Sequence, residues 1–325
     1  MRNRNLFTYF IATILVIVLA GSISGMIMSG MKDNPYKVSV VVVDSSSVRW
    51  NSFYNGLQQA AKDYNIKLNI VSTSNGVNMD QEYKLINEEI ADGAQGLILQ
   101  VDNSRGTENM ISEISGKVAL ELVDTSADAD VDVEGKYACI EADNEALGRA
   151  IASELRIALG NDLSNYKIGL VMGNQKQYSM QKRREGFLNG IESTGATIAW
   201  EIGNINNITN AIRYRQTEDE RVDILVALCD DGLEAICEYA LWTGDDVYIY
   251  GEGNSIRNVA YIDHGLIDSM IVPNEYYMGY QSLVAVYSRL ENKLTPMMDE
   301  EVPYKVINKE NLFSEENQRL MFPIG

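Results

Sequence analysis

Histidine and cysteine are scarce in this chain of 325 residues. Because His264 is the only histidine, a Ser-His-Asp triad would have to be built on that residue, and the His pairs typical of zinc sites are excluded. Cys139, Cys229 and Cys237 show no CxxC spacing and have apolar neighbours, which predicts small buried side chains. A disulfide between Cys229 and Cys237 is not expected, since one would follow a strand and the other would lie on a helix. The sequence therefore predicts neither a metal site nor a cofactor.

Basic residues are outnumbered by acidic ones. The chain has 27 Lys and Arg against 46 Asp and Glu, a formal net charge of -19. Because such a surface repels phosphate backbones, nucleic acid is not an expected partner. The hydrophobic fraction of 46% and the charged fraction of 22% are ordinary for a folded globular protein. At roughly 150 residues per domain, the length allows two globular units.

Residues 6–31 contain no charged side chain, whereas Arg2 and Arg4 precede them and Lys32 follows. At about 1.5 Å per residue, a helix of this length can cross a hydrocarbon core of about 30 Å. The basic residues predict a cytoplasmic N-terminus, with the rest of the chain outside the cytoplasmic membrane, in the periplasm or at the cell surface. A cleaved signal peptide is the alternative, because small residues follow the apolar run. Residues 19–22 resemble the bacterial lipoprotein box, but Ser22 stands where the lipidated cysteine belongs.

Short apolar runs alternate with segments of helical period in the rest of the chain. The runs predict strands over residues 38–43, 67–71, 96–101, 118–123, 137–140, 167–172, 197–202, 224–228, 247–250 and 266–272. The helical period predicts helices over residues 49–64, 81–91, 144–159, 179–193, 208–215, 233–242 and 275–291. Alternating strands and helices predict an α/β fold with parallel sheets covered by helices on both faces.

Small polar residues follow most of the predicted strands. Ligands of open parallel sheets bind beyond the carboxyl ends of the strands, where loops and helix N-termini point donors inward. Two such rims facing each other would form a hydrogen-bonding cleft, to which Asn103 in the segment after strand 96–101 would contribute. The alternative is that these residues only cap helices and form turns.

The order and spacing of several segments resemble the type 1 periplasmic solute-binding proteins, with the ribose and galactose binders as the most similar branch. The resemblance covers residues 37–305 and is carried by VSVVVVDSSSVRWNSFYNGLQQAAKDYNIKLNIV, DGAQGLILQVDNS, ALELVDTS, EADNEALGRAIASEL, QKRREGFLNGI, VDILVALCDDGLEAI, VYIYGEGNS and GLIDSMIVPNEYYMGYQSL. It implies two doubly wound parallel-sheet lobes joined by a three-strand hinge, with crossings near Ala142, Pro273 and Lys305. Lobe one would combine residues 37–142 with 274–304, lobe two would combine 143–273 with 305–325, and residues 1–36 would be the signal or anchor segment and linker.

The resemblance also implies ligand contacts. Trp50 matches an aromatic that stacks on the sugar ring, although a core aromatic on the first helix is the alternative. Asp124 matches a carboxylate that accepts hydrogen bonds from sugar hydroxyls. Thr125 and Gln181 stand where sugar binders have arginines, so hexose specificity is not implied. With Asn103, the predicted ligand-binding residues are Ser46, Ser47, Arg49, Trp50, Asp124, Tyr178, Gln181, Asp230, Glu252, Asn254 and Asn274.

Three functions compete at this level. The first is a binding protein that delivers a sugar-like small molecule to the membrane permease of an ABC importer. The second is a sensory binding protein, anchored in the membrane by its N-terminal helix, that reports the ligand to a histidine kinase or another receptor. An enzyme is not expected, because residues 251–256 (GEGNSI) lack the third glycine of a dinucleotide-binding loop.

Overall fold

The computed structural model describes residues 34–73, 78–127, 136–203 and 207–322. The predicted N-terminal anchor or signal segment lies outside these residues. Lys37–Gly325 forms one compact unit. Among the described residues, no helix combines the length and the apolar character needed to cross a membrane.

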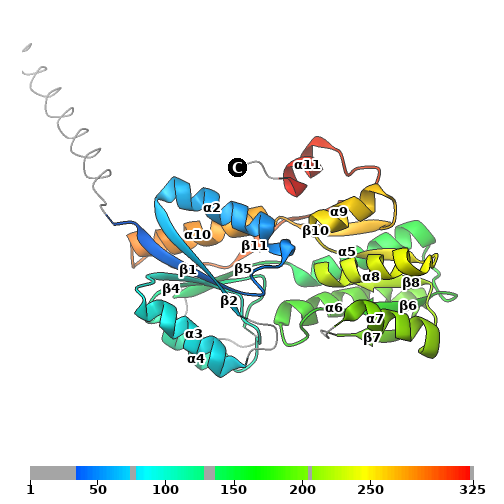
Figure 1. The fold of residues 1–325 in the computed structure, drawn as a ribbon, viewed down its shortest axis with the longest axis horizontal. Coiled ribbons are helices and arrows are strands. Elements are labelled where there is room, and N and C mark those ends of the chain that lie inside the picture. The colour runs from blue at the N-terminus through cyan, green and yellow to red at the C-terminus, as the bar shows by residue number, and fades with distance from the viewer. Residues whose placement is uncertain (1–33, 74–77, 128–135, 204–206, 323–325) are drawn as a thin grey trace, which may run out of the picture. The chain divides into compact units, whose positions relative to one another are not determined.

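The first sheet has six strands in the order β11-β5-β4-β3-β1-β2. The strands are β1 (Tyr36–Val43), β2 (Ile66–Thr73), β3 (Gly96–Leu99), β4 (Ala119–Val123), β5 (Tyr137–Ala142) and β11 (Glu300–Val302). The helices around it are α2 (Asn51–Tyr64), α3 (Met79–Ala91), α4 (Glu108–Ser115) and α10 (Glu275–Glu291). Because side chains alternate along a strand, Val38 and Val40 pack with α2 and α10, whereas Val41 packs with α3 and α4. The two helix layers lie on opposite faces of the sheet (Figure 1).

The second sheet repeats this plan, with the order β12-β10-β9-β8-β6-β7. The strands are β6 (Lys167–Val171), β7 (Thr197–Ile202), β8 (Ile224–Ala227), β9 (Tyr248–Glu252), β10 (Ser269–Pro273) and β12 (Tyr304–Ile307). The helices are α5 (Asn144–Leu159), α6 (Tyr178–Ile191), α7 (Ile208–Tyr214), α8 (Asp230–Thr243), α9 (Ile256–Asp263) and α11 (Glu315–Met321). Short turns of other helix types complete the chain at Val48–Trp50, Glu192–Thr194 and Arg215–Asp219. Side chains of α5 and α6 pack on one face of the sheet and those of α8 and α9 on the other.

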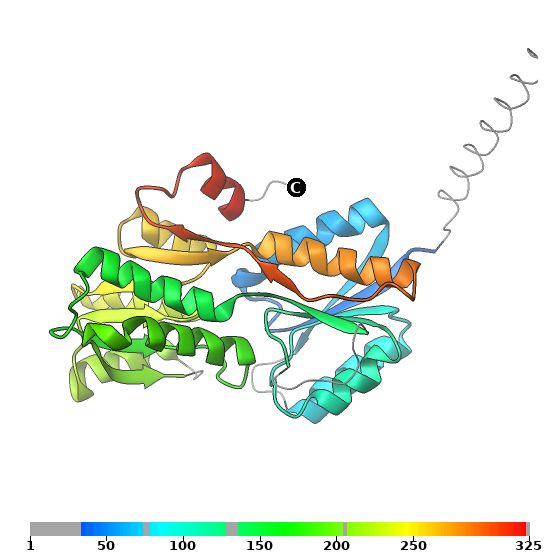
Figure 2. The same cartoon turned by 180° about the vertical axis from the view of Figure 1, so that it is seen from behind.

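The chain passes three times between the two sheets (Figure 2). It leaves the first sheet after Ala142, returns after Pro273, and leaves again at Pro303, between β11 and β12. β12 therefore enters the second sheet at the end where β10 leaves it, and the two strands pair antiparallel, with Pro273 opposite Tyr304. The prediction of parallel sheets is therefore wrong for β12 in the second sheet, whereas β1–β3, β3–β4, β4–β5 and β5–β11 in the first sheet all pair parallel.

All the strands and helices predicted from the sequence are present; β7, α5 and α10 have the predicted bounds, and the others have shifted ends. Five further elements were not predicted from the sequence: α4, α9, α11, β11 and β12. The three cysteines are buried and free, as predicted. In both sheets the strand order reverses beside the first strand, between β1 and β3 and between β6 and β8. Such a switch point leaves a crevice at the carboxyl ends of the strands, where α/β proteins bind ligands.

Candidate functional site

A cavity of about 100 Å³ lies where the switch points of the two sheets meet. The first sheet contributes Val43 and Asp44 at the end of β1 and Gln100 after β3. The second contributes residues 172–174 after β6 and Cys229 after β8. Both rims predicted from the strand ends therefore border one cavity.

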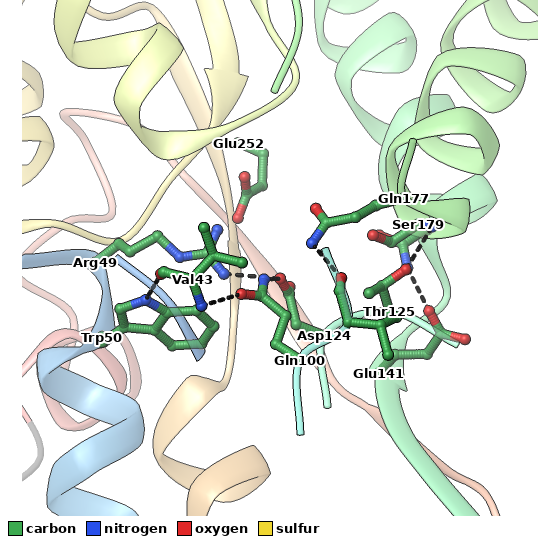
Figure 3. Close-up of polar contacts among 12 residues, drawn as sticks. Val43, Arg49, Trp50, Gln100, Asp124, Thr125, Glu141, Gln177, Ser179 and Glu252 are labelled. Carbon is green, nitrogen blue, oxygen red and sulfur yellow. Dashed lines mark hydrogen bonds and ion pairs between the residues drawn. The ribbon is translucent and has the colours of Figure 1, made fainter. Parts of the chain in front are cut away.

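Arg49, which lines this cavity, forms an ion pair with Asp124 (Figure 3). Arg49 Nη2 donates to Asp124 Oδ2 at 2.7 Å, and Gln100 Nε2 donates to the same oxygen at 2.5 Å. Gln100 Oε1 accepts from the Val43 backbone N–H at 3.1 Å, which ties the end of β1 to this pair. Burial alone would raise the pKa of Asp124, but the charges of Arg49 and Arg183 and the hydrogen bonds lower it below its usual value.

The backbone around this pair is unusual. Asp44 and Asp124 have φ angles of 46° and 65°, a left-handed conformation that residues other than glycine seldom adopt. Both residues directly follow strands of the first sheet, β1 and β4. Unfavourable backbone conformations persist where the surrounding structure holds them, and they gather at binding sites.

Trp50 anchors the start of α2 rather than standing free in the cavity. Its side chain is 1% exposed, and its Nε1 donates to the Val43 carbonyl oxygen at 3.1 Å. The ring lies 5.3 Å from that of Phe53, within the core of the first sheet. The Arg49 guanidinium stacks 4.0 Å from the centre of the Trp50 ring, so Trp50 supports the cation while also lining the cavity.

A second buried ion pair lies on the opposite rim. Arg183 Nη1 donates to Glu252 Oε2 at 2.8 Å and to the Leu228 carbonyl oxygen at 2.6 Å. Arg183 Nε and Nη2 both donate to Asn144 Oδ1. Burial raises the pKa of Glu252 to about 7, although the Arg183 charge opposes this shift. The Glu252 side chain extends from β9 towards the space beside Arg49 (Figure 3).

Asp230 fixes the loop that follows β9. Its Oδ1 accepts hydrogen bonds from the backbone N–H groups of Asn254 and Ser255, at 2.7 and 2.9 Å, and from Asn258 Nδ2 at 2.9 Å. Glu275, the first residue of α10, is 5% exposed, and burial raises its pKa to about 8. The charges of Arg49, Asp124 and Glu252 also act on this carboxyl group.

Loops of the two sheets also bond directly to each other. Asn174 Nδ2 donates to the carbonyl oxygen of Asp102 at 2.7 Å, and Gln177 Nε2 donates to that of Val101 at 3.0 Å. The Ser179 backbone N–H donates to Thr125 Oγ1 at 3.2 Å (Figure 3). These bonds join the loops that follow β3 and β4 to the start of α6 and the loop that precedes it.

The structure brings some of the predicted site residues to this cavity and places others elsewhere. Ser47, Arg49 and Trp50 line the cavity, and Asp124 pairs with Arg49. Asp230, Glu252 and Asn254 lie at or just after the ends of β8 and β9 but are not among the lining residues, and Asn254 borders a separate pocket. Ser46 is exposed and donates to Asp44, Asn103 caps a turn at Arg105, and Gln181 donates to the Gln175 carbonyl oxygen. Asn274 caps α10, and Tyr178 faces a separate acidic groove beside β5.

Sequence reasoning left Gln100, Asn174, Gln177, Arg183 and Glu275 out of the predicted set. Gln100 and Glu275 stand one or two residues after a strand that crosses the sheet interior. A position directly after a strand could have marked them as site residues, because the carboxyl ends of parallel strands meet at one edge of the sheet. Arg183 carried no such signal, because its role depends on partners more than 35 residues away. Among the described residues, no group of three or more His, Cys, Asp or Glu could hold a metal ion.

Two mostly parallel α/β sheets, joined by three crossings and enclosing a polar cavity at their switch points, define a two-lobed binding protein of the type 1 periplasmic class. Residues 38–294 match the family model of the periplasmic binding protein domain, and the chain belongs to that family. The resemblance seen in the sequence is confirmed. Family membership also confirms a binding protein rather than an enzyme, and it implies a location outside the cytoplasm.

Solved structures share this fold at low sequence identity. A carbohydrate transporter solute-binding protein from Agrobacterium radiobacter, in complex with D-arabinose, is 15% identical, with a TM-score of 0.79 over 89% of this chain and 100% of that chain. GanP, a glucose-galactose binding protein from Geobacillus stearothermophilus, is 18% identical, with a TM-score of 0.74 over 86% and 100%. XylFII in its complex with LytSN is 17% identical, with a TM-score of 0.74 over 85% and 99%. No curated protein sequence matches this chain.

Proposed function

We propose that this protein binds a small polar ligand, a sugar or sugar-like molecule, outside the cytoplasm and presents it to an ABC importer. The observation that carries the proposal is the cavity at the facing switch points, with carboxylate, guanidinium and amide groups on both rims. Such groups match the hydroxyls of a sugar, which donate and accept hydrogen bonds. The D-arabinose in the Agrobacterium radiobacter protein and the name of GanP support a ligand of this class.

The lobes would close around the ligand by a hinge motion. Lobe one comprises residues 37–142 with 274–304, and lobe two comprises 143–273 with 305–325. The hinge lies at the three crossings described above. Ser47, Arg49, Trp50 and Asp124 would hold the ligand from lobe one. Asp230, Glu252 and Asn254 would hold it from lobe two.

Thermal unfolding of the full chain against a library of sugars, polyols, nucleosides and amino acids tests this function. A ligand at a hundred times its Kd adds about 2.7 kcal/mol to the unfolding free energy, which gives a readable rise in Tm. We expect one sugar or sugar-like class to raise the Tm. No shift from any compound, or a shift from amino acids alone, contradicts the proposal.

The variant Asp124→Asn tests the site. Asparagine tolerates the left-handed backbone at this position but carries no charge to pair with Arg49. We expect the ligand to bind at least tenfold more weakly, because hydrogen bonds to charged groups contribute roughly 1.5–3 kcal/mol. Asp263→Asn, at an exposed position at the end of α9, is the matched control and should bind as the parent does. Equal affinities for the two variants would remove Asp124 from the site.

A membrane-anchored sensory protein is the second candidate. The observation in its favour is that XylFII, which has the same fold, forms a complex with a second protein, LytSN. Deleting the gene and measuring uptake of the identified ligand separates the two functions. Lost uptake supports transport. Unchanged uptake with a lost transcriptional response to the ligand supports signalling to a histidine kinase or another receptor.

A further inference from the structure

Two consecutive acidic residues begin α8, and the structure gives them different surroundings. Asp230 is 3% exposed and does not line the cavity. Its Oδ1 accepts hydrogen bonds from the backbone N–H groups of Asn254 and Ser255 and from Asn258 Nδ2. Asp231 is exposed and is one of the residues that line the cavity. Asp230 therefore holds the loop after β9, whereas Asp231 borders the space in which the ligand would lie.

The Asp231 carboxyl group has no partner within the part of the chain that the structure describes. No described residue forms a hydrogen bond or an ion pair with it. The surrounding protein partly shields it from water and so raises its pKa, while the charge of Arg49 lowers the pKa and those of Asp230 and Asp44 raise it. Asp231 is therefore an uncommitted acceptor in the cavity lining.

Arg49 faces Asp231 from the other rim of the cavity. It lines the same cavity, and its charge acts on the Asp231 carboxyl group. Arg49 pairs through Nη2 with Asp124 rather than with Asp231, and its Nη1 has no hydrogen-bond acceptor among the described residues. The cavity therefore offers a guanidinium donor on the side of the first sheet and a carboxylate acceptor on the side of the second.

Hydroxyl groups suit this arrangement. A hydroxyl group both donates and accepts, so neighbouring hydroxyls of one molecule can donate to Asp231 and accept from Arg49. Hydrogen bonds to ionised groups are stronger than those between neutral groups. A carboxylate that loses its water on closure without gaining a donor is costly, so a ligand that supplies the donor gains affinity when the lobes close.

We infer that Asp231 is a ligand contact of lobe two, where its carboxylate accepts a hydrogen bond from one hydroxyl group of the sugar-like ligand while Arg49 donates to a neighbouring oxygen. This inference rests on the proposed function, since it adds a contact in the same cavity. It makes Asp231 a residue that determines specificity, because a sugar without that hydroxyl group would leave the carboxylate without a donor.

Calorimetric titration of the full chain measures this contact. The probes are D-arabinose, D-glucose, D-galactose and any other sugar that raises the Tm in the library above. We expect Asp231→Ala to weaken binding of the bound sugar by roughly tenfold or more. Asp231→Asn should weaken it less, because an amide oxygen still accepts a hydrogen bond but carries no charge.

Asp80→Ala is the matched control. Asp80 is also an exposed acidic residue in the first turn of a helix, α3, but it does not line the cavity. If Asp231 only stabilised the N-terminus of α8, both alanine variants would lose some stability and keep the parent's affinity. Equal affinities for Asp231→Ala and Asp80→Ala therefore overturn the inference, while the proposed function stands. If no sugar binds the parent protein, both fail.

Monodeoxy analogues of the bound sugar provide a readout that a structural role of Asp231 would not move. For D-galactose these include 2-deoxy-D-galactose and 6-deoxy-D-galactose. Removing the hydroxyl group that contacts Asp231 should weaken binding to the parent by roughly tenfold or more, yet change binding to Asp231→Ala little. Removing any other hydroxyl group should weaken binding to both proteins by the same factor. If every analogue loses the same factor with both proteins, no hydroxyl group is coupled to Asp231 and the inference fails.

Discussion

Glu121 shows how one residue can make the stability of this fold depend on pH. It lies within β4, its side chain is 0% exposed, and neither carboxyl oxygen has a hydrogen-bond partner among the described residues. Burial raises its pKa well above the usual value, and the nearby carboxyl groups of Asp299 and Glu300 raise it further. Because an unpaired buried charge is costly, the folded protein favours the protonated form.

We predict that Glu121→Gln removes this pH dependence. A carboxyl group whose pKa is raised in the folded state stabilises the protein below its unfolded pKa of about 4.3. This stabilisation is lost as the pH rises towards the folded-state pKa. The variant should therefore be more stable than the parent at pH 8 and about equally stable at pH 4.5. The expected difference at pH 8 is about 1.4 kcal/mol for each unit by which the folded-state pKa exceeds the unfolded pKa, counted up to pH 8. Urea unfolding at both pH values measures the difference.

The control for this experiment is Glu301→Gln, on the exposed edge strand β11. It removes one acidic charge from the same sheet, on a strand separated from β4 by β5, without changing a buried group. If both variants shift stability equally at pH 8, the effect comes from net charge rather than from burial of Glu121.

The site residues show what a sequence reveals at this scale. The resemblance to solute-binding proteins predicted Arg49, Asp124 and Glu252 as ligand contacts, and the structure places Arg49 in the lining of the cavity and in an ion pair with Asp124. Their partners could not be predicted, because pairing depends on side-chain direction and on residues distant along the chain. Asn274 also follows a strand, yet its Oδ1 accepts from the Tyr277 backbone N–H and caps α10. Capping and ligand binding use the same residue types, so the pattern alone does not separate them.

At the scale of elements, periodicity predicted the long helices and buried strands well. It missed β11 and β12, which have three and four residues, because such runs are too short for a period to emerge. The direction of β12 was also unpredictable, since it follows from where the chain crosses between the sheets. Residues 55–71 (NGLQQAAKDYNIKLNIV) and 189–202 (NGIESTGATIAWEI) are weakly similar in sequence. The structure places them in corresponding units, because α2–β2 and α6–β7 occupy equivalent places in the two sheets.

Glycines bring two helix pairs into backbone contact. A Cβ atom on Gly186 of α6 would lie 2.0 Å from the Glu145 carbonyl oxygen of α5, and one on Gly148 would lie 2.0 Å from that of Arg183. In the same way, a Cβ atom on Gly56 of α2 would lie 2.1 Å from the Tyr276 carbonyl oxygen of α10, and one on Gly279 would lie 2.1 Å from that of Phe53. Each helix pair therefore packs closer than side chains would allow, and this packing positions Arg183 beside Asn144.

We predict that Gly186→Ala destabilises the protein. The added methyl group must separate α5 from α6, and overpacking of this kind costs roughly 1–3 kcal/mol. Chemical denaturation measures the loss. Asn189→Ala, at an exposed position of the same helix, is the control and should be neutral or slightly stabilising because alanine favours helix. Equal stability of Gly186→Ala and the parent would show that the helices separate freely.

At the scale of the whole binding unit, the loops that enclose the cavity bond to one another directly. Asn174 donates both to the carbonyl oxygen of Asp102 and to its Oδ1, at 2.7 and 3.1 Å. Gln177 and Ser179 add bonds to the loops after β3 and β4. These contacts join residues of the two proposed lobes, so the closed arrangement is stabilised by the protein as well as by its ligand. Ligand affinity then includes the free energy of closure.

We predict that Asn174→Ala weakens ligand binding by roughly tenfold, since two hydrogen bonds at about 0.5–1.5 kcal/mol each are lost only from the closed form. Small-angle scattering should show a larger radius of gyration without ligand and the parent value at saturation. The Tm without ligand should hardly change, because each sheet keeps its own core. Lys176→Ala, in the same loop with an exposed side chain, is the control. If Asn174→Ala retains the parent's affinity and scattering, these bonds do not contribute to closure, and the ligand alone must drive it.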